Sequence, residues 1–204
     1  MKKVACLIYP NFSLYEITDL TSSLVLQYGI TVDYVAVNKK SIFSEDGLIC
    51  QATKALDEVN LDDYSCVILP GMSDFTLALK NDSLICFLKK LKEKSIVIAA
   101  ISSAPLLLAK AGVLSEVTFT GGIWQNFFDY FDFLSKENFV SKTVHKDKNV
   151  ITAIGFAHRE FAKKVLAALG LCEDIGEIKE TSKKLIYKMS DQDFAEFKTN
   201  FEQS

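Results

Sequence analysis

Residues 96–112 of the chain read IVIAAISSAPLLLAKAG, and this stretch decides the fold. Ile96–Ile101 is an apolar, largely β-branched run, which is typical of a strand buried on both faces of a parallel sheet. Leu106–Ala111 consists mainly of leucine and alanine and is predicted to be helical. Almost no loop separates the two, so Ser102 has to turn the chain in an unusual backbone conformation beside small neighbours. The stretch therefore predicts a strand that passes directly into a helix.

Other apolar runs of the same kind are spaced along the chain, at Val4–Tyr9, Thr31–Val37 and Cys66–Leu69. Between the runs, apolar residues recur three and four positions apart, as in helices lying on a sheet, over Leu14–Tyr28 and Leu84–Lys94. This alternation predicts an α/β fold with a doubly wound, mostly parallel sheet sandwiched by helices. Such sheets bind ligands at the carboxyl ends of their strands, here after Tyr9, Leu69 and Ile101.

Two segments have the chemistry of hairpins. Ile42–Gln51 carries Ser44-Glu45-Asp46-Gly47 between two short apolar pieces, and glycine tolerates the positive φ that tight turns need. The second predicted hairpin joins Phe139–His145 to Asn149–Ala153 through a turn of residues 146–149.

The C-terminal part is predicted to be helical. Phe161–Leu169 has helical spacing and ends before Gly170, a good C-terminal cap. The tail from Glu173 is amphipathic and is predicted to form two helices with a break near Met189, the second capped by Ser190 or Asp191.

Length and composition suit one soluble domain over residues 1–204, with a core of about 1–170 and a helical tail of about 173–204. The formal net charge is -3, without a Lys/Arg block, so nucleic acid is not an expected partner. The 5 cysteines include no C-x-x-C pair and lie mostly in apolar runs, which indicates a reducing cytoplasm.

No membrane partner is expected either. The first apolar run is broken at Tyr9-Pro10-Asn11, too early for a signal peptide. Residues 95–114 are long enough to cross a bilayer, but Ser102, Ser103 and Pro105 interrupt them, so a strand, turn and helix are predicted instead.

Ser102 is the candidate reactive residue. A sharp turn between a strand and a helix resembles a nucleophile elbow, which raises a side chain to where backbone N–H groups point outward. The simpler interpretation is that Ser102 or Ser103 only caps the helix, because serine is a preferred N-cap and proline suits the first turn. On the turn alone, the cap is the more common outcome.

The chain is similar to the ThiJ/PfpI superfamily in three motifs. Residues 99–105 (AAISSAP) resemble that family's elbow, which normally carries cysteine at the turn, and residues 67–72 (VILPGM) resemble its strand ending in Pro-Gly-Gly. Glu16 falls where the family has a buried glutamate. The likeness covers about residues 1–170 and implies a flavodoxin-like domain of the class I glutamine amidotransferase type. Members include proteases, amidases, glyoxalases, deglycases, chaperones and stress sensors, so activity varies widely.

The resemblance also implies roles for individual residues. Ser102 takes the place of the reactive cysteine, Glu16 that of its carboxylate partner, and the loop at Gly71 and Met72 joins Ser103 in forming the oxyanion hole. Residues 117–122 resemble the segment in which several members carry a catalytic histidine, and this chain has Gly121 there, next to the binding site.

The change from thiol to hydroxyl alters the expected chemistry. A free thiol has a pKa of ~8.5, which a suitable site lowers below neutrality, whereas a serine hydroxyl reacts only when an adjacent base removes its proton. Glu16 is the preferred base, because a buried carboxylate with a raised pKa accepts a hydroxyl hydrogen bond. The alternative for Glu16 is an exposed glutamate in the first turn of a helix.

The other candidate groups are weaker. His145 lies among lysines and is expected to be solvated, and His158 begins a helix near the site but is expected to have a surface or packing role. An aromatic cluster over Trp124–Phe133 is expected to pack in the core or a dimer interface, or to wall the pocket. No residues have metal-ligand spacing and no dinucleotide or phosphate motif is present, so neither a cofactor nor a metal is expected.

These observations predict a cytoplasmic hydrolase of small substrates, similar to amidases, proteases or glyoxalases, with weak activity because Ser102 replaces cysteine. The alternative is a non-catalytic module that binds a small ligand or takes part in a stress-related interaction on the same fold. A homodimer is implied by the resemblance alone.

Overall fold

The computed structural model describes residues 2–173 and 188–203 of the chain. Its main sheet has 7 strands in the order β5-β2-β1-β6-β7-β9-β8. The strands are β1 (Lys3–Leu7), β2 (Val32–Ala36), β5 (Lys54–Ala55), β6 (Tyr64–Leu69), β7 (Val97–Ile101), β8 (Val144–Asp147) and β9 (Val150–Ala153). All pairs are parallel except β8 with β9. The predicted mostly parallel sheet of a flavodoxin-like fold is confirmed.

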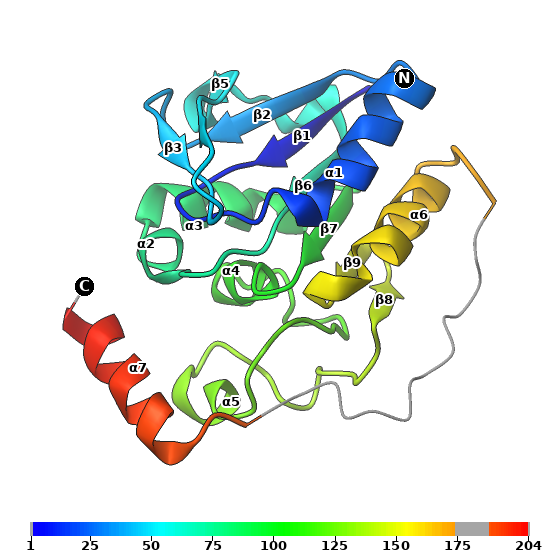
Figure 1. Ribbon diagram of the computed structural model, residues 1–204. Helices are drawn as coiled ribbons and strands as arrows, with labels where there is room; N and C mark the ends of the chain where they lie inside the picture. Colours follow the sequence, from blue (N-terminus) through cyan, green and yellow to red (C-terminus); the bar gives the residue numbers. More distant parts are fainter. Residues whose placement is uncertain (1, 174–187, 204) are drawn as a thin grey trace.

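Helices cover both faces of the sheet (Figure 1). On one face α1 (Tyr15–Ser22), which continues as a π-helical turn over Ser23–Gln27, packs against α6 (His158–Ala168). On the other face α3 (Asp82–Lys89) packs against α4 (Pro105–Lys110), and α2 (Thr76–Leu79) contacts both. The helices predicted after β1, after β7 and before Gly170 are confirmed, each within a few residues of its predicted bounds.

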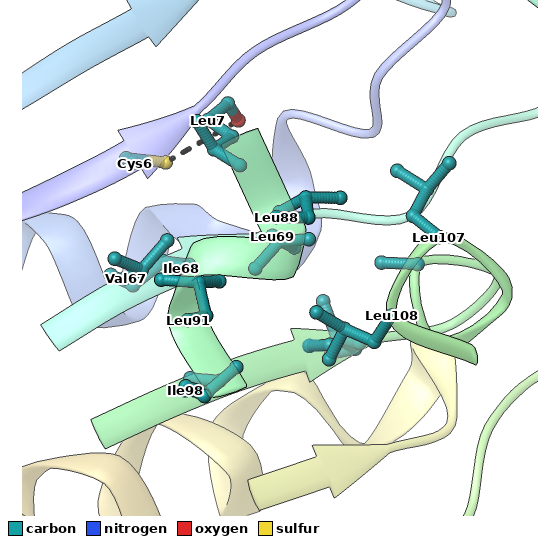
Figure 2. Close-up of a cluster of buried hydrophobic side chains, with 14 of the residues drawn as sticks. Cys6, Leu7, Val67, Ile68, Leu69, Leu88, Leu91, Ile98, Leu107 and Leu108 are labelled. Atoms are coloured by element: carbon teal, nitrogen blue, oxygen red, sulfur yellow. Dashed lines mark hydrogen bonds between the residues drawn. The ribbon is translucent and has the colours of Figure 1, made fainter. Parts of the chain in front are cut away.

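The core lies between the sheet and these helices. Figure 2 shows one part of it, where leucines from the α3 and α4 side lie near the strands that carry Val67, Ile68 and Ile98. The central strands are buried on both faces: along β6 and β7 the residues Val67–Leu69 and Ile98–Ile101 are almost completely inaccessible. Branched apolar side chains pack well on such a two-sided pleated surface, which explains why these runs form the middle of the sheet.

The first predicted hairpin is confirmed, and the second is shifted along the chain. Strands β3 (Ile42–Phe43) and β4 (Ile49–Cys50) pair around the predicted Gly47 turn. In the second hairpin Asp147 pairs with Val150, so the strand extends through residues expected to form the turn. Lys148 adopts a φ of 51°, which allows a turn of only two residues. Charged residues therefore occupy this edge strand, where one side of the strand faces water.

The C-terminal helix α7 (Asp191–Gln203) lies beside the short helix α5 (Phe127–Tyr130) (Figure 1). Ser190 caps α7, because its Oγ accepts a hydrogen bond from Asp193 N–H at 3.1 Å. This confirms the second predicted tail helix and selects Ser190 over Asp191 as its cap. The first predicted tail helix falls mainly within residues 174–187, outside the described residues.

The chain crosses from one side of β1 to the other after β5, since β2 and β5 lie on one side of β1 and β6 lies on the other. Such a switch point opens a crevice at the carboxyl ends of the neighbouring strands. The segments after β1, β6, β7 and β9 all meet there. No helix among the described residues is long and apolar enough to cross a membrane.

Candidate active site

Ser102 turns the chain between β7 and α4. Its φ of 61° lies in the left-handed region, which is uncommon for a residue with a side chain. Two backbone hydrogen bonds hold it there: Ser102 N–H donates to Ala153 O at 2.8 Å, and Gly122 N–H donates to Ser102 O at 2.7 Å. The predicted unusual conformation is therefore present, stabilised by segments distant in sequence.

Neither serine of the turn caps the following helix. The residue at the N-cap of α4 is Ala104, and no side-chain hydrogen bond caps this end. Ser103 instead faces the loop after β6, where its Oγ accepts from Met72 N–H at 2.9 Å and donates to Met72 O at 3.0 Å. The simple helix-cap interpretation of Ser102 and Ser103 is wrong, because the Ser103 hydroxyl joins two strand ends instead.

Glu16 is a buried carboxylate near the start of α1. The residue is only 2% exposed, and its Oε2 accepts a hydrogen bond from Gly71 N–H at 2.6 Å. The alternative of an exposed helix glutamate is therefore wrong. Burial raises the pKa of Glu16 to about 7, although the Gly71 N–H and the neighbouring Ser102 hydroxyl both stabilise the charged form and oppose the rise. A carboxyl group poised near neutrality is suited to accept and return a proton.

Glycines allow the strand ends to approach this pair closely. A Cβ atom on Gly71 would fall 2.4 Å from Ser102 Cβ and 2.5 Å from Glu16 Oε2. On Gly155, after β9, it would fall 2.6 Å from Glu16 Oε1 and 3.2 Å from Ser102 Oγ. Each of these positions requires glycine because a side chain would collide with the Ser102–Glu16 pair.

The backbone around Gly121 leaves no room for the histidine that the family resemblance implies at this position. A Cβ atom there would lie 2.9 Å from Ser102 O and 3.0 Å from Pro105 Cγ. The backbone of the turn fills the space, so a histidine side chain cannot be placed at residue 121 in this arrangement. Any base for Ser102 has to come from another element.

The two histidines have other partners. His158 Nδ1 lies 2.8 Å from Asp19 Oδ2, and the imidazole meets the Tyr15 ring edge-on at 5.7 Å between centroids. His145 belongs to the edge strand β8, and its Nε2 lies 2.8 Å from Thr118 Oγ1. His145 is half-buried in this network, so the expected full solvation is wrong. His158 has the predicted packing role, through Asp19 and Tyr15.

A pocket of about 320 Å³ opens above Ser102. Ser102 lies in it together with Tyr15 and the glycines Gly122 and Gly155, and its apolar walls come from Ile123, Trp124, Ile154 and Phe156. Tyr15 OH reaches toward Glu16 Oε1 at 3.5 Å.

Several of these pocket residues were not predicted from the sequence. Tyr15 directly precedes Glu16, and Gly155-Phe156 begins two residues after the last residue of β9, Ala153, at a fourth strand end. The rule that pointed to the other three strand ends would have found the last two. No comparable signal singled out Tyr15.

The aromatic cluster divides between two roles. Trp124 lines the pocket, whereas Phe127 and Phe131 are buried and pack against rings from α7, Phe197 lying 5.0 Å from Phe127 between centroids. Most of the cluster is thus core packing, as the default interpretation predicted.

Most of the N–H groups implied for an oxyanion hole already have acceptors. Gly71 N–H donates to Glu16 and Met72 N–H donates to Ser103 Oγ. Ser103 N–H has no acceptor among the residues that the structure describes. Within the same residues, no group of three or more His, Cys, Asp or Glu side chains is placed to hold a metal ion. The geometry therefore offers a hydroxyl, a carboxyl group and one N–H donor.

Comparison with known proteins identifies the family of the chain. The DJ-1/PfpI family matches residues 2–168. Two Bacillus subtilis (strain 168) relatives are both named as uncharacterized proteases: YdeA is 29% identical over 166 residues, covering 81% of this chain and 82% of YdeA; YoaZ is 30% identical over 167 residues, covering 76% of this chain and 75% of YoaZ.

Among solved structures, a DJ-1 superfamily protein from Agrobacterium tumefaciens has a similar fold. The TM-score is 0.76 at 20% identity, and the match covers 100% of this chain and 99% of that one. Since the family match extends over residues 2–168, the chain belongs to the DJ-1/PfpI family.

Proposed function

We propose that this protein is a slow hydrolase of small amides or esters, with Ser102 as the nucleophile and Glu16 as the general base. One observation carries the proposal: the Ser102 hydroxyl lies in a strained turn beside a buried carboxyl group whose pKa is raised to about 7. A base is most effective when its pKa is close to the working pH, because it then both accepts and releases a proton readily.

The reaction would proceed through an acyl-enzyme. Ser102 Oγ bonds to the substrate carbonyl carbon while its proton passes to Glu16, and the carbonyl oxygen becomes negative. The C–N or C–O bond then breaks, and the leaving amine or alcohol departs with the proton from Glu16. Water next attacks the acyl group and gives a proton to Glu16; the C–Oγ bond breaks and Ser102 Oγ recovers that proton as the carboxylic acid is released.

Slow turnover is expected from the oxyanion side of the site. Ser103 N–H is the donor that remains available, since Gly71 and Met72 use theirs elsewhere. Removal of one oxyanion donor from a serine hydrolase costs about 10²–10³ in turnover, so a site with a single donor should be slow.

The proposal also has indirect support. The two Bacillus subtilis relatives carry the name protease, which favours hydrolysis of an acyl bond. All 5 cysteines are unpaired thiols, which suits a reducing cytoplasm. Homodimerisation is proposed from family membership alone.

A serine-directed phosphonate probe tests the nucleophile. We expect labelling of Ser102 that disappears in Ser102→Ala, slows in Glu16→Gln and is unchanged in Ser83→Ala, a control at an exposed serine of α3. Turnover of small neutral esters should likewise be lost in Ser102→Ala, reduced in Glu16→Gln and unchanged in Ser83→Ala. Absence of labelling at high probe excess would contradict the proposal.

The engaged N–H groups of Gly71 and Met72 favour a second candidate, a non-catalytic module that binds a small ligand in the same pocket. Saturable binding without turnover, unaffected by Glu16→Gln, would select it. Turnover that Ser102→Ala abolishes would select the hydrolase.

A further inference from the structure

The side chains that line the pocket above Ser102 carry no charge at neutral pH. Its walls are Ile123, Trp124, Ile154 and Phe156, and its polar groups are the hydroxyls of Ser102 and Tyr15. Burial and the neighbouring Glu16 raise the pKa of Tyr15 further above its ordinary value, so this phenol stays neutral. An ionised ligand would lose hydration on entry and meet no lining group of opposite charge.

Glu16 does not supply that charge to a ligand. The residue is 2% exposed, and Gly71 and Gly155 close over both of its carboxyl oxygens. The oxygen that faces Gly71 already accepts a backbone hydrogen bond at 2.6 Å. The carboxyl group reaches the pocket only beside Ser102 Oγ, where it exchanges protons during acyl transfer, and it does not line the pocket as a partner for an ammonium group.

The charges on the nearby helices are also engaged with one another. Asp19 Oδ2 lies 2.8 Å from His158 Nδ1 and 3.8 Å from Arg159 Nε. Glu45 acts on Glu16 and on Tyr15 as a further negative charge. The field around the pocket therefore disfavours anions in particular.

The pocket does expose aromatic surface. Trp124 is 39% exposed, Tyr15 51% and Phe156 70%, although all three line a concave site. Large aromatic side chains left in water around one cavity are the surface that a planar apolar group would cover favourably. The volume of about 320 Å³ is at the lower end of the range for small-molecule pockets.

We infer that this pocket selects small uncharged carbonyl compounds that carry an aromatic ring or a flat apolar group, and that it rejects carboxylates and amines of the same size. The placement of the carbonyl group at Ser102 rests on the proposed hydrolase function. The charge and shape selection rests on the pocket walls and holds for binding without reaction.

Trp124 provides the test, because it is the only tryptophan of the chain and lines the pocket. Its fluorescence, excited at a wavelength where the ligands do not absorb, is titrated with benzamide, benzoate, benzylamine and acetamide at pH 7. We expect saturable binding of benzamide, and binding at least about tenfold weaker for the two ionised analogues and for acetamide, which lacks the ring. Equal or tighter binding of benzoate or benzylamine, or no response to any of the four, would overturn the inference.

Two substitutions at one exposed side chain sharpen the result. Phe156→Ala should weaken benzamide binding several-fold, and Phe156→Lys should improve benzoate binding by adding the missing positive charge. Leu26→Ala is the control, since Leu26 is 84% exposed on the π-helical turn and does not line the pocket. Unchanged affinities in both Phe156 variants would contradict the inference.

The titration in Ser102→Ala separates this inference from the proposed function. Selective benzamide binding in that variant, with no ester turnover by the unsubstituted protein, would contradict the proposed hydrolase function and support the inferred ligand class. Turnover of charged esters in preference to neutral ones would support the hydrolase function and contradict the inferred ligand class.

Discussion

Gly155 and Glu16 lie so close together that a Cβ atom on Gly155 would fall 2.6 Å from Glu16 Oε1. The segment after β9 therefore packs directly against the carboxyl group that α1 supplies, although 138 residues separate Glu16 from Gly155 along the chain. This approach encloses Glu16 and keeps water away from it, which is the physical cause of its raised pKa.

Substitution of Gly155 tests that contact. Gly155→Ala should displace the Glu16 carboxylate, because the added methyl group has no room, and should destabilise the protein by about 1–3 kcal/mol. The same change in a Glu16→Ala background should cost much less, since the colliding oxygen is gone. Chemical denaturation of the four proteins measures the coupling. Equal costs in both backgrounds would show that the contact is absent.

The pH dependence of stability should carry the signature of Glu16. The pKa of this group rises from 4.5 to about 7 on folding, so between these values the folded state holds a proton that the unfolded state has lost. The stabilisation is complete below about pH 4.5 and is lost as the pH rises to about 7. At ~1.4 kcal/mol per pKa unit, the loss is roughly 3 kcal/mol.

Urea denaturation at several pH values, with Glu16→Gln as the reference, isolates this contribution from those of other groups. The free energy of unfolding of the unsubstituted protein should fall more steeply between pH 5 and 7 than that of the variant. Parallel curves would show that Glu16 ionises as readily in the folded chain as in the unfolded one.

Ser102→Cys should speed acyl transfer by roughly tenfold or more toward activated esters. A thiol ionises at a pKa of ~8.5 or lower in such a turn and does not rely on Glu16 to remove its proton during attack. Ester turnover and the rate of alkylation by iodoacetamide at position 102 measure the effect, with Ser102→Ala as the inactive control. A cysteine variant as slow as the unsubstituted protein would indicate that the oxyanion side of the site limits the rate.

Ser103→Ala should destabilise the fold by about 1–3 kcal/mol, because the Met72 N–H and C=O would both lose their buried partner. Ser83→Ala, at an exposed position of α3, should change stability by less than about 0.5 kcal/mol. Denaturant midpoints compare the two. A similar small change in both variants would mean that the Ser103 hydroxyl does not hold the strand ends together.

Phe197→Ala should loosen α7 without unfolding the rest of the protein. Phe197 contacts Phe75 and Phe127 at centroid distances of 5.8 Å and 5.0 Å, and no residue of α7 is fully buried. Local opening of such an element costs less than global unfolding. Hydrogen exchange in α7 should accelerate while Tm changes little.

Trp124 gives that prediction a second readout, because it lines both the pocket above Ser102 and a second cavity beside Phe197. Its fluorescence should shift in Phe197→Ala. Glu196→Ala, on the exposed side of α7, is the control and should leave exchange and fluorescence unchanged. Equal exchange rates in both variants would contradict the predicted docking.

The pattern of apolar residues was enough to predict most of the fold. Runs such as Cys66–Leu69 and Ile96–Ile101 became the central strands, because a run buried on both faces is recognisable without knowledge of its neighbours. The hairpin at β8 and β9 was less predictable. Its register depends on cross-strand pairing of Asp147 with Val150 and on a positive φ at Lys148, and neither follows from local composition.

The candidate site shows the same division. The turn at Ser102 was predictable from residues 96–112 alone, because a strand and a helix joined without a loop leave few backbone conformations and require small neighbours. The tertiary structure decided what that turn faces. Burial of Glu16, the use of Met72 N–H by Ser103 and the pairing of His158 with Asp19 all depend on segments distant in sequence. Local sterics are short-ranged, whereas burial and hydrogen-bond partners exist only after the sheet has brought these segments together.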